Sequence, residues 1–434
     1  MRLGLVADGF NLYGNMSSTH STWLVILIPY NLLPWMCIKR SSFMLSLLIF
    51  GPTLPRKVRD VYLQHLVEEL KELWDVGVKM FDVSSKKSFQ MHAALLWTIN
   101  DFPAYGDISS WSTKSALTCP PYNYDCQSCW LKYGRKFSYI RYRRFLDSNY
   151  KFCKQKQSFN GHVDTRSAPI MVSEGKIMLQ KDAVVDHVFG KKTVNLPNKR
   201  KRWKEALTLW KKRSIFFTLP YWEEHVLSYN FNIMHIEKNV FDNIISTLLN
   251  LDGKTNDNLK ARQDLKDMGI RSELHLEKVG KDKTHIPHAC YHMDASKKNG
   301  FLQVLKDVKV PDGYSSNISR YVKLKKRKIS GMKSHDDHIL MQQLFPIAIR
   351  KSLPPEVSRP LIGLSCFFRK LRSKVLNVDE LRALEKKIAV TLCELERIFP
   401  PSFFTMMVHL VMHLASETKV TGPIHYLWMY PIER

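Results

Sequence analysis

Short apolar runs broken by turn residues fill the first 110 residues, and their lengths restrict the fold more than any other feature of the sequence. The runs at 2–7, 23–28 and 43–49 have strand length and are bounded by Gly, Pro or polar residues, which predicts three strands. Residues 60–74 then place Val and Leu at helical spacing, and 93–99 forms another apolar run. The beginning of the chain is therefore expected to be α/β, with three strands, a helix and a fourth strand.

This order of elements matches the start of an RNase H-like fold. Further along, 214–219 is predicted as a short strand and 233–249 as a helix, because apolar residues there recur every four positions. After a polar stretch, helices of a second domain are expected at 339–349, 358–371, 379–398 and 403–414.

A strong positive charge limits the classes of function. The 434 residues carry 66 Lys and Arg against 40 Asp and Glu, a formal net charge of +26. Residues 131–213 hold 22 of these cations and 6 of the acids, a net +16, and read as a basic insertion. A composition that is 44% hydrophobic excludes a disordered basic tail as the whole molecule, so we expect a globular protein with a polyanionic partner.

Cysteine content, basic clusters and the most apolar stretch indicate the cellular compartment and whether the chain enters a membrane. Eight cysteines fit a reducing compartment, and the basic clusters 199–202 and 325–328 are typical either of nuclear localisation or of a solvated charged surface. The most apolar stretch, 22–38, contains Pro29, Asn31 and Pro34, so it reads as a buried strand and a turn. We expect a nuclear protein that does not enter membranes.

Three acidic residues stand out by position. Asp8 follows the first predicted strand, Asp101 follows the fourth, and Glu237 lies in the first turns of the helix at 233–249. In an RNase H-like sheet these positions meet at one edge, where three carboxylates can hold two Mg²⁺ ions for in-line phosphoryl transfer. The alternative is that the three are ordinary turn and cap residues.

Seven stretches carry a family resemblance. They are RLGLVADGFN at 2–11, LLWTINDFPAYG at 95–106, SSWSTK at 109–114, MHIEKN at 234–239, KSHD at 333–336, FPPSFF at 399–404 and GPIHYLWMYPIER at 422–434. Together they resemble the transposases of plant CACTA (En/Spm-type) DNA transposons over nearly the whole chain. Where such relatives carry an Asp before MHIEKN, this chain has Asn232.

The resemblance implies a DDE-type site on an RNase H-like fold that cuts and pastes DNA. Carried over by position, its catalytic and metal-binding residues are Asp8, Asp101 and Glu237, with two Mg²⁺ or Mn²⁺ ions. The partners implied are the transposon ends and the target DNA, together with a second copy or an accessory transposon protein. Phosphate contacts are expected from the insertion, at Arg143, Arg144, Lys199, Arg200, Lys201 and Arg202.

The expected domains follow the same resemblance. An RNase H-like catalytic domain covers 1–270, with the basic insertion at about 112–213. A polar connector covers 271–329, and a mostly α-helical accessory domain, C-terminally truncated, covers 330–434. The rival interpretation is a catalytically inactive DNA-binding or protein-interaction remnant; a membrane-surface protein is more distant.

The helix start decides whether Asn232 inactivates the chain. If Asn232 is the helix N-cap, a role that Asn fills as well as Asp, Glu237 is the acid expected to reach the metal. If relatives instead use the Asp at that position as the ligand, this chain is an inactivated copy.

The insertion lacks most of the metal ligands that the resemblance implies. Relatives have a CPxC pair and two histidines, where this chain keeps Cys119 but has Tyr122, Tyr142 and Tyr150. No zinc site is therefore expected, although four other residues offer a substitute set: Cys126, Cys129, Cys153 and His162.

Two histidine pairs are also open to two interpretations. His409 and His413 have metal-ligand spacing on a helix, but they read better as packed core histidines. His335 and His338 beside two aspartates can be explained by metal chelation or by helix capping.

Overall fold

The computed structural model describes residues 1–10, 22–51, 59–113, 115–164, 166–172, 177, 209–210, 212–279, 283–311, 317–332 and 334–427. The chain divides into two compact units. The first unit consists of 1–123, 171–232 and 425–434, and the second of 124–170 and 233–424.

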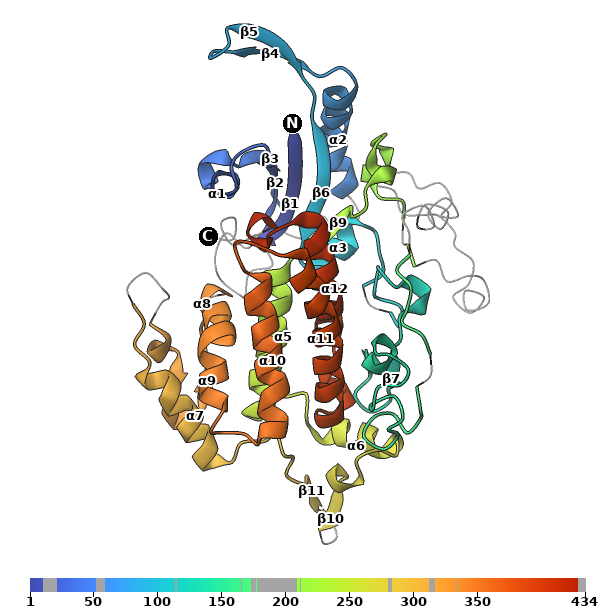
Figure 1. Cartoon of the computed structure of the whole chain (residues 1–434), viewed down its shortest axis with the longest axis vertical. Coiled ribbons are helices and arrows are strands. Elements are labelled where there is room, and N and C mark those ends of the chain that lie inside the picture. Colours follow the sequence, from blue (N-terminus) through green and yellow to red (C-terminus); the bar gives the residue numbers. More distant parts are fainter. Residues whose placement is uncertain are drawn as a thin grey trace. The chain divides into compact units, whose positions relative to one another are not determined.

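A five-stranded mixed sheet forms the centre of the first unit (Figure 1). Its strands are β1 (Arg2–Phe10), β2 (Thr22–Pro29), β3 (Met44–Ile49), β6 (Ala94–Asn100) and β9 (Tyr229–Phe231). The order is β3-β2-β1-β6-β9, with β2 antiparallel to β1 and β3, and with β6 parallel to β1 and β9. The four strands predicted in the first 110 residues are confirmed. The strand predicted at 214–219 is wrong, because Ile215–Thr218 forms a 3₁₀ turn and β9 is the fifth strand.

Helices and a ribbon complete the first unit. Its helices are α1 (Pro34–Cys37), α2 (Arg59–Asp75) and α3 (Phe102–Ile108), and its separate two-stranded ribbon is β4 (Val78–Asp82) with β5 (Lys87–Met91). Leu63, Leu66 and Leu70 of the predicted apolar side of α2 are buried, whereas Val61 of the same pattern is 37% exposed. A small core joins Val6, Ile26 and Ile99 to Leu427 from the far end of the chain. Among the described residues, no helix combines the length and apolarity needed to cross a bilayer.

The second unit is mostly helical. Its helices are α5 (Ile233–Leu248), α6 (Leu259–Asp267), α7 (Ala295–Asp307), α8 (Ser334–Ile339), α9 (Phe345–Ile349), α10 (Pro355–Leu371), α11 (Val378–Ile398) and α12 (Met406–Thr421). Its short hairpins are β7 (Cys129–Leu131) with β8 (Lys136–Ser138), β10 (Glu277–Val279) with β11 (Lys283–His285), and β12 (Val322–Lys323) with β13 (Lys328–Ile329). Helix α11 packs on both α10 and α12, and α12 also packs on α5. The helices predicted for the second half are confirmed, but the last begins at Met406 because Pro401–Phe403 forms a 3₁₀ turn.

A buried polar network links the end of the expected catalytic domain, at Asp257 and Arg262, to Tyr291 and His292 of the expected connector. The Asp257 carboxylate accepts from the Arg262 Nε at 2.5 Å and from the Tyr291 hydroxyl at 2.6 Å, and His292 Nε2 lies 3.1 Å away. Burial alone raises the pKa of Asp257, but hydrogen bonds from His292 and Arg262 and the guanidinium charge outweigh it and lower the pKa to about 2. The polar composition of this part of the chain therefore reflects a buried ion pair as well as surface residues.

Candidate active site

Asp8 and Asp101 lie at corresponding positions of two neighbouring parallel strands. The paired register of β1 and β6 ends at Val6 opposite Ile99, and each aspartate is two residues further along its own segment. Neighbouring strands are about 4.8 Å apart, so both carboxylates belong to the same edge of the sheet. The predicted adjacency of the two strands is confirmed. Strand β1 continues to Phe10, two residues beyond Asp8, because it stays paired with β2 there.

Local hydrogen bonds orient both carboxylates. Asp101 is the N-cap of α3, and its Oδ1 accepts from the Ala104 amide at 2.8 Å. The Asp8 Oδ1 accepts from the amide of Gly9 at 2.7 Å. Both side chains are half-buried. A carboxylate offers about four lone-pair positions, so capping leaves Asp101 able to bind a cation.

A buried arginine at the start of α2 interacts with the same edge. Arg59 is 1% exposed, stacks on the Trp23 ring at 3.6 Å and donates to the Asp107 carboxylate at 3.1 Å. Burial lowers the pKa of the Arg59 guanidinium, and the nearby charges of Asp107, Asp60 and Asp101 oppose that shift. Its Nε and Nη1 have no hydrogen-bond partner among the residues that the structure describes.

Sequence reasoning missed Arg59, because one cation at the start of a helix has no distinguishing pattern. Its neighbour Asp60 is also buried and pairs with Lys212. The surroundings of Asp101 therefore include a buried cation as well as carboxylates.

Glu237 belongs to the second unit, where it lies in the second turn of α5. The side chain is 1% exposed. Its Oε1 accepts from the Gln342 Nε2 at 2.7 Å, and its Oε2 lies 2.7 Å from the His338 Nδ1. The convergence of Glu237 with Asp8 and Asp101 stays a prediction.

The partners of Glu237 lie where α8 passes into a π-helical turn, Leu340–Leu344. Such turns are rare and are frequent at functional sites. In the same region, burial raises the pKa of the Asp337 carboxyl to about 7, and the negative charge of Asp242 adds to the shift. His338, which the sequence offered as a metal ligand or a capping residue, is thus a buried partner of Glu237.

Helix α5 begins at Ile233, so Asn232 occupies the N-cap position that the sequence predicted. Its backbone amide donates to the Asn100 carbonyl at 2.9 Å, beside the end of β6. Five helical residues separate Asn232 from Glu237, about 140° around the helix axis, so the two side chains point in different directions.

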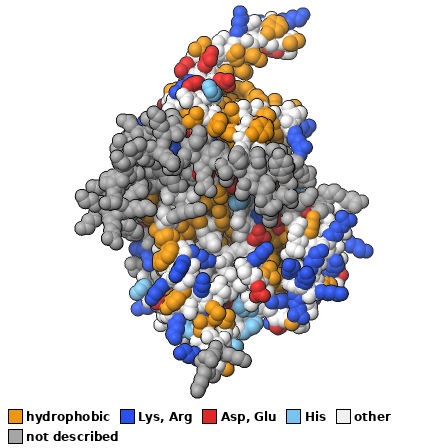
Figure 2. Space-filling view, turned by 180° about the vertical axis from the view of Figure 1, so that it is seen from behind, with side chains coloured by type: hydrophobic (Ala, Val, Ile, Leu, Met, Phe, Trp, Pro, Cys, Tyr) orange, Lys and Arg blue, Asp and Glu red, His pale blue; other side chains and the backbone are white. Residues whose placement is uncertain are grey.

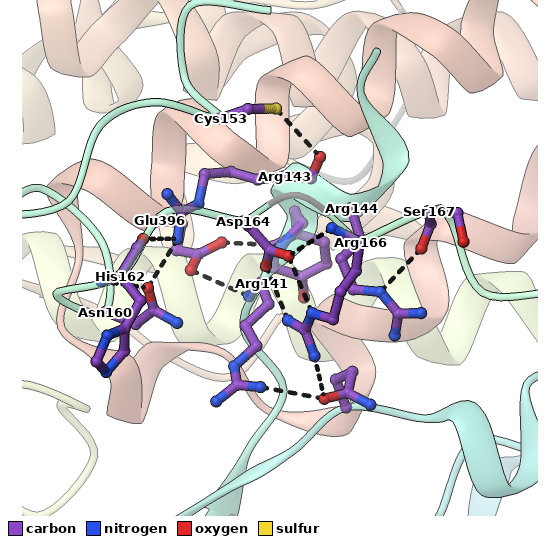
Figure 3. Close-up of polar contacts among 12 residues, drawn as sticks. Arg141, Arg143, Arg144, Cys153, Asn160, His162, Asp164, Arg166, Ser167 and Glu396 are labelled. Carbon is purple, nitrogen blue, oxygen red and sulfur yellow. Dashed lines mark hydrogen bonds and ion pairs between the residues drawn. The ribbon is translucent and has the colours of Figure 1, made fainter. Parts of the chain in front are cut away.

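Arg143, expected to contact DNA phosphates, is an internal residue (Figure 3). It is 1% exposed and stacks over the Phe159 ring at 4.3 Å. Its guanidinium donates to the Gln155 carbonyl at 2.5 Å, to the Asn160 Oδ1 at 2.7 Å and to the His162 carbonyl at 3.0 Å. Because these acceptors hold it inside the second unit, we do not propose a phosphate contact for it.

Arg144 is also committed within the fold. It is 6% exposed and donates to the Asp125 carboxylate and to the Ser167 carbonyl, both at 3.0 Å. The remaining basic candidates, Lys199, Arg200, Lys201 and Arg202, lie outside the described residues. A run of adjacent basic residues predicted surface charge at 143–144, but the apolar ring and the carbonyl groups around them decide their burial.

The substitute zinc set does not assemble among the described residues. Cys126, Cys129, Cys153 and His162 do not supply three ligand atoms within 4.8 Å of one another. The thiol of Cys153 is buried and donates to the Asp147 carbonyl at 3.4 Å. Tyr142, at a position where the resemblance predicts a histidine, is buried, and its amide donates to the Glu396 carboxylate at 3.0 Å.

His409 and His413 lie on the buried side of α12, with ring centroids 5.5 Å apart. Burial lowers the pKa of His409 to about 4 and the pKa of His413 well below the usual value. The His409 ring also packs against Tyr139, at 5.7 Å between centroids. At neutral pH both imidazoles are therefore uncharged.

The fold and this edge define an α/β protein whose mixed sheet presents two carboxylates from adjacent parallel strands. Comparison with known families makes the assignment more specific. Residues 1–184 match the model of the transposase family tnp2. Residues 371–434 match a domain of unknown function (DUF4218), consistent with a plant transposase and a following domain. A search of curated proteins gave no match.

Proposed function

We propose that this protein is a DDE-type DNA transposase of RNase H-like fold that hydrolyses the phosphodiester bond at a transposon end. The freed 3′-hydroxyl then attacks target DNA. The observation that carries the proposal is the placement of Asp8 and Asp101 at one edge of adjacent parallel strands, inside the segment that matches a transposase family. The sheet order β3-β2-β1-β6-β9, with β2 antiparallel to its neighbours, supports an RNase H-like fold.

The donor set at this edge fits a divalent cation. Asp8 and Asp101 offer half-exposed carboxylate oxygens, the ligands that Mg²⁺ and Mn²⁺ prefer. Glu237 is our third ligand, and the hydrogen bond from Gln342 fixes its carboxylate orientation. When bound, such ions stabilise the charge that develops on the phosphate during in-line displacement.

The chain's own residues have separate tasks in this proposal. The N-cap bond from Ala104 fixes the direction of Asp101. The buried Arg59 holds positive charge beside Asp101 and Asp107, which limits the repulsion between carboxylates that share an edge. The net charge of +26 attracts DNA over a distance, and we place the protein in the nucleus, where its substrate is found.

A nicking assay tests the proposal. Supercoiled DNA that carries the ends of the parent transposon is incubated with the full chain in Mg²⁺, Mn²⁺ or EDTA. We expect metal-dependent nicking that Asp8→Asn and Asp101→Asn each reduce at least a hundredfold. Asp75→Asn, which changes an exposed aspartate at the end of α2, is the matched control. A wild-type chain that binds DNA but never nicks it would refute the nuclease proposal.

The same assay decides the role of position 232. Because α5 starts at Ile233, we expect Asn232→Asp to leave nicking unchanged and Glu237→Gln to abolish it. If Asn232→Asp instead confers activity that the natural chain lacks, the third ligand is at 232 and the natural chain is inactive.

A further inference from the structure

Strands β4 and β5 form a ribbon that is inserted between α2 and β6. Figure 1 shows it beyond the end of α2, away from the five-stranded sheet of the first unit. The two strands are paired over five positions, from Val78 opposite Met91 to Asp82 opposite Lys87. Five residues in a strand span about 17 Å, so the ribbon is long enough to reach a partner molecule.

Large apolar side chains are exposed on both faces of this ribbon. Strand alternation puts Val78, Met80 and Phe89 on one face, where 40%, 42% and 47% of their surfaces are exposed. Phe81 lies on the opposite face and is 58% exposed. An isolated two-stranded ribbon is marginally stable in water, so this exposure points to a partner that covers both faces.

Positive charge gathers at the outer part of the ribbon. Lys86 and Lys87 lie where the turn enters β5, and Lys79 lies nearer to α2 on β4, against a single acid, Asp82. Figure 2 shows Lys and Arg side chains at the outer end of the ribbon and hydrophobic ones along it. The carboxylate of Asp82 accepts from the Ser84 amide at 3.0 Å, so it is used to shape the turn. The ribbon therefore presents a net charge of +2 together with exposed apolar groups.

We propose that this ribbon, residues 78–91, is a DNA-binding arm that enters a groove of duplex DNA. The major groove is about 12 Å wide and admits a two-stranded ribbon, whose two faces then meet the two walls. The lysines neutralise phosphates, and exposed side chains such as Phe81 contact thymine methyl groups in the major groove.

Duplex DNA explains the ribbon better than a second copy of the chain does. A partner copy that covers the face of Val78, Met80 and Phe89 would leave Phe81 exposed on the opposite face. Packing two such ribbons against each other also brings their lysines together, and like charges oppose association. This inference concerns binding alone, so a failure of the nuclease proposal would leave it standing.

Salt-dependent binding to a 30-base-pair duplex without transposon sequences tests the arm. The variant is Lys86→Gln with Lys87→Gln, and the matched control is Lys386→Gln with Lys387→Gln, two exposed residues of α11. Each lost phosphate contact reduces the slope of log K against log salt by about 0.9. We expect the slope of the ribbon variant to fall by about two and that of the control to stay unchanged.

Phe81→Ala separates groove contact from charge alone. We expect it to weaken binding at least fivefold without changing the salt slope, because it removes an apolar contact and no cation. Equal slopes for the wild type and the ribbon variant, or equal losses in variant and control, would overturn the proposal. Sedimentation provides a further check, since a ribbon variant that loses self-association while keeping its DNA affinity would identify a second copy as the occupant.

Discussion

The buried pair of Asp257 and Arg262 yields a stability prediction with a worked magnitude. Neither side chain is exposed, so Asp257→Asn leaves the guanidinium without its counter-ion. Removing one partner of a buried ion pair costs about 3–5 kcal/mol. The pKa of Asp257 falls from 3.8 to about 2 on folding, which corresponds to about 2 kcal/mol of that stability.

The pH dependence has a definite sign. Because the folded pKa is depressed, the contribution is present above about pH 4 and is lost as pH falls towards 2. The difference between the wild type and Asp257→Asn should therefore be largest near neutral pH and shrink below pH 4.

Hydrogen exchange measured by mass spectrometry reports this loss locally in a chain with two units. Peptides around 257–275 and 286–293 should lose at least 2 kcal/mol of opening free energy in Asp257→Asn, while peptides of β1 and β6 keep theirs. Asp267→Asn, at an exposed aspartate that ends α6, is the matched control. Equal protection in wild type and Asp257→Asn would refute the argument that this carboxylate stabilises the segment.

Three further predictions concern single side chains. Asp101→Ala should lower the free energy of unfolding by about 1 kcal/mol because α3 loses its cap. Asp101→Asn should keep the cap and the stability, and thermal denaturation measures both variants. Arg143→Met should destabilise by about 3 kcal/mol because it leaves buried carbonyls without a donor, yet the salt slope of DNA binding should not change. Glu237→Gln should lower the opening free energy of α8 by about 1–3 kcal/mol, because His338 loses its carboxylate partner. Hydrogen exchange in α8 should therefore become faster, and unchanged exchange would contradict this.

Apolar periodicity predicted most of the first sheet. The runs that became β1, β2, β3 and β6 are long and bounded by turn residues, so local pattern and tertiary packing agree there. Strand β9 escaped prediction because three residues, Tyr229–Phe231, are too few to show alternation. The strand predicted at 214–219 is wrong because these apolar residues form a 3₁₀ turn, in which most of their side chains are also buried.

The candidate site was only partly readable from the sequence. Asp8 and Asp101 could be found because each follows a clear apolar run, and parallel pairing brings such positions to one edge. Arg59 and Gln342 could not, and His338 was singled out only for other roles, because their importance depends on contacts with residues far away in the chain. Arg143 shows the converse, since a basic run indicates charge but not whether that charge faces solvent.

The central claim is that Asp8 and Asp101 hold a divalent cation at this edge of the sheet. Binding of Mn²⁺ tests this claim most directly. Titration of the full chain, followed by calorimetry or by the spin-resonance signal of free Mn²⁺, gives stoichiometry and affinity without any requirement for DNA cleavage. We predict that the wild type binds Mn²⁺ and that the double variant Asp8→Asn with Asp101→Asn loses this binding, while Asp75→Asn retains it. Equal Mn²⁺ binding by the wild type and the double variant would contradict the account.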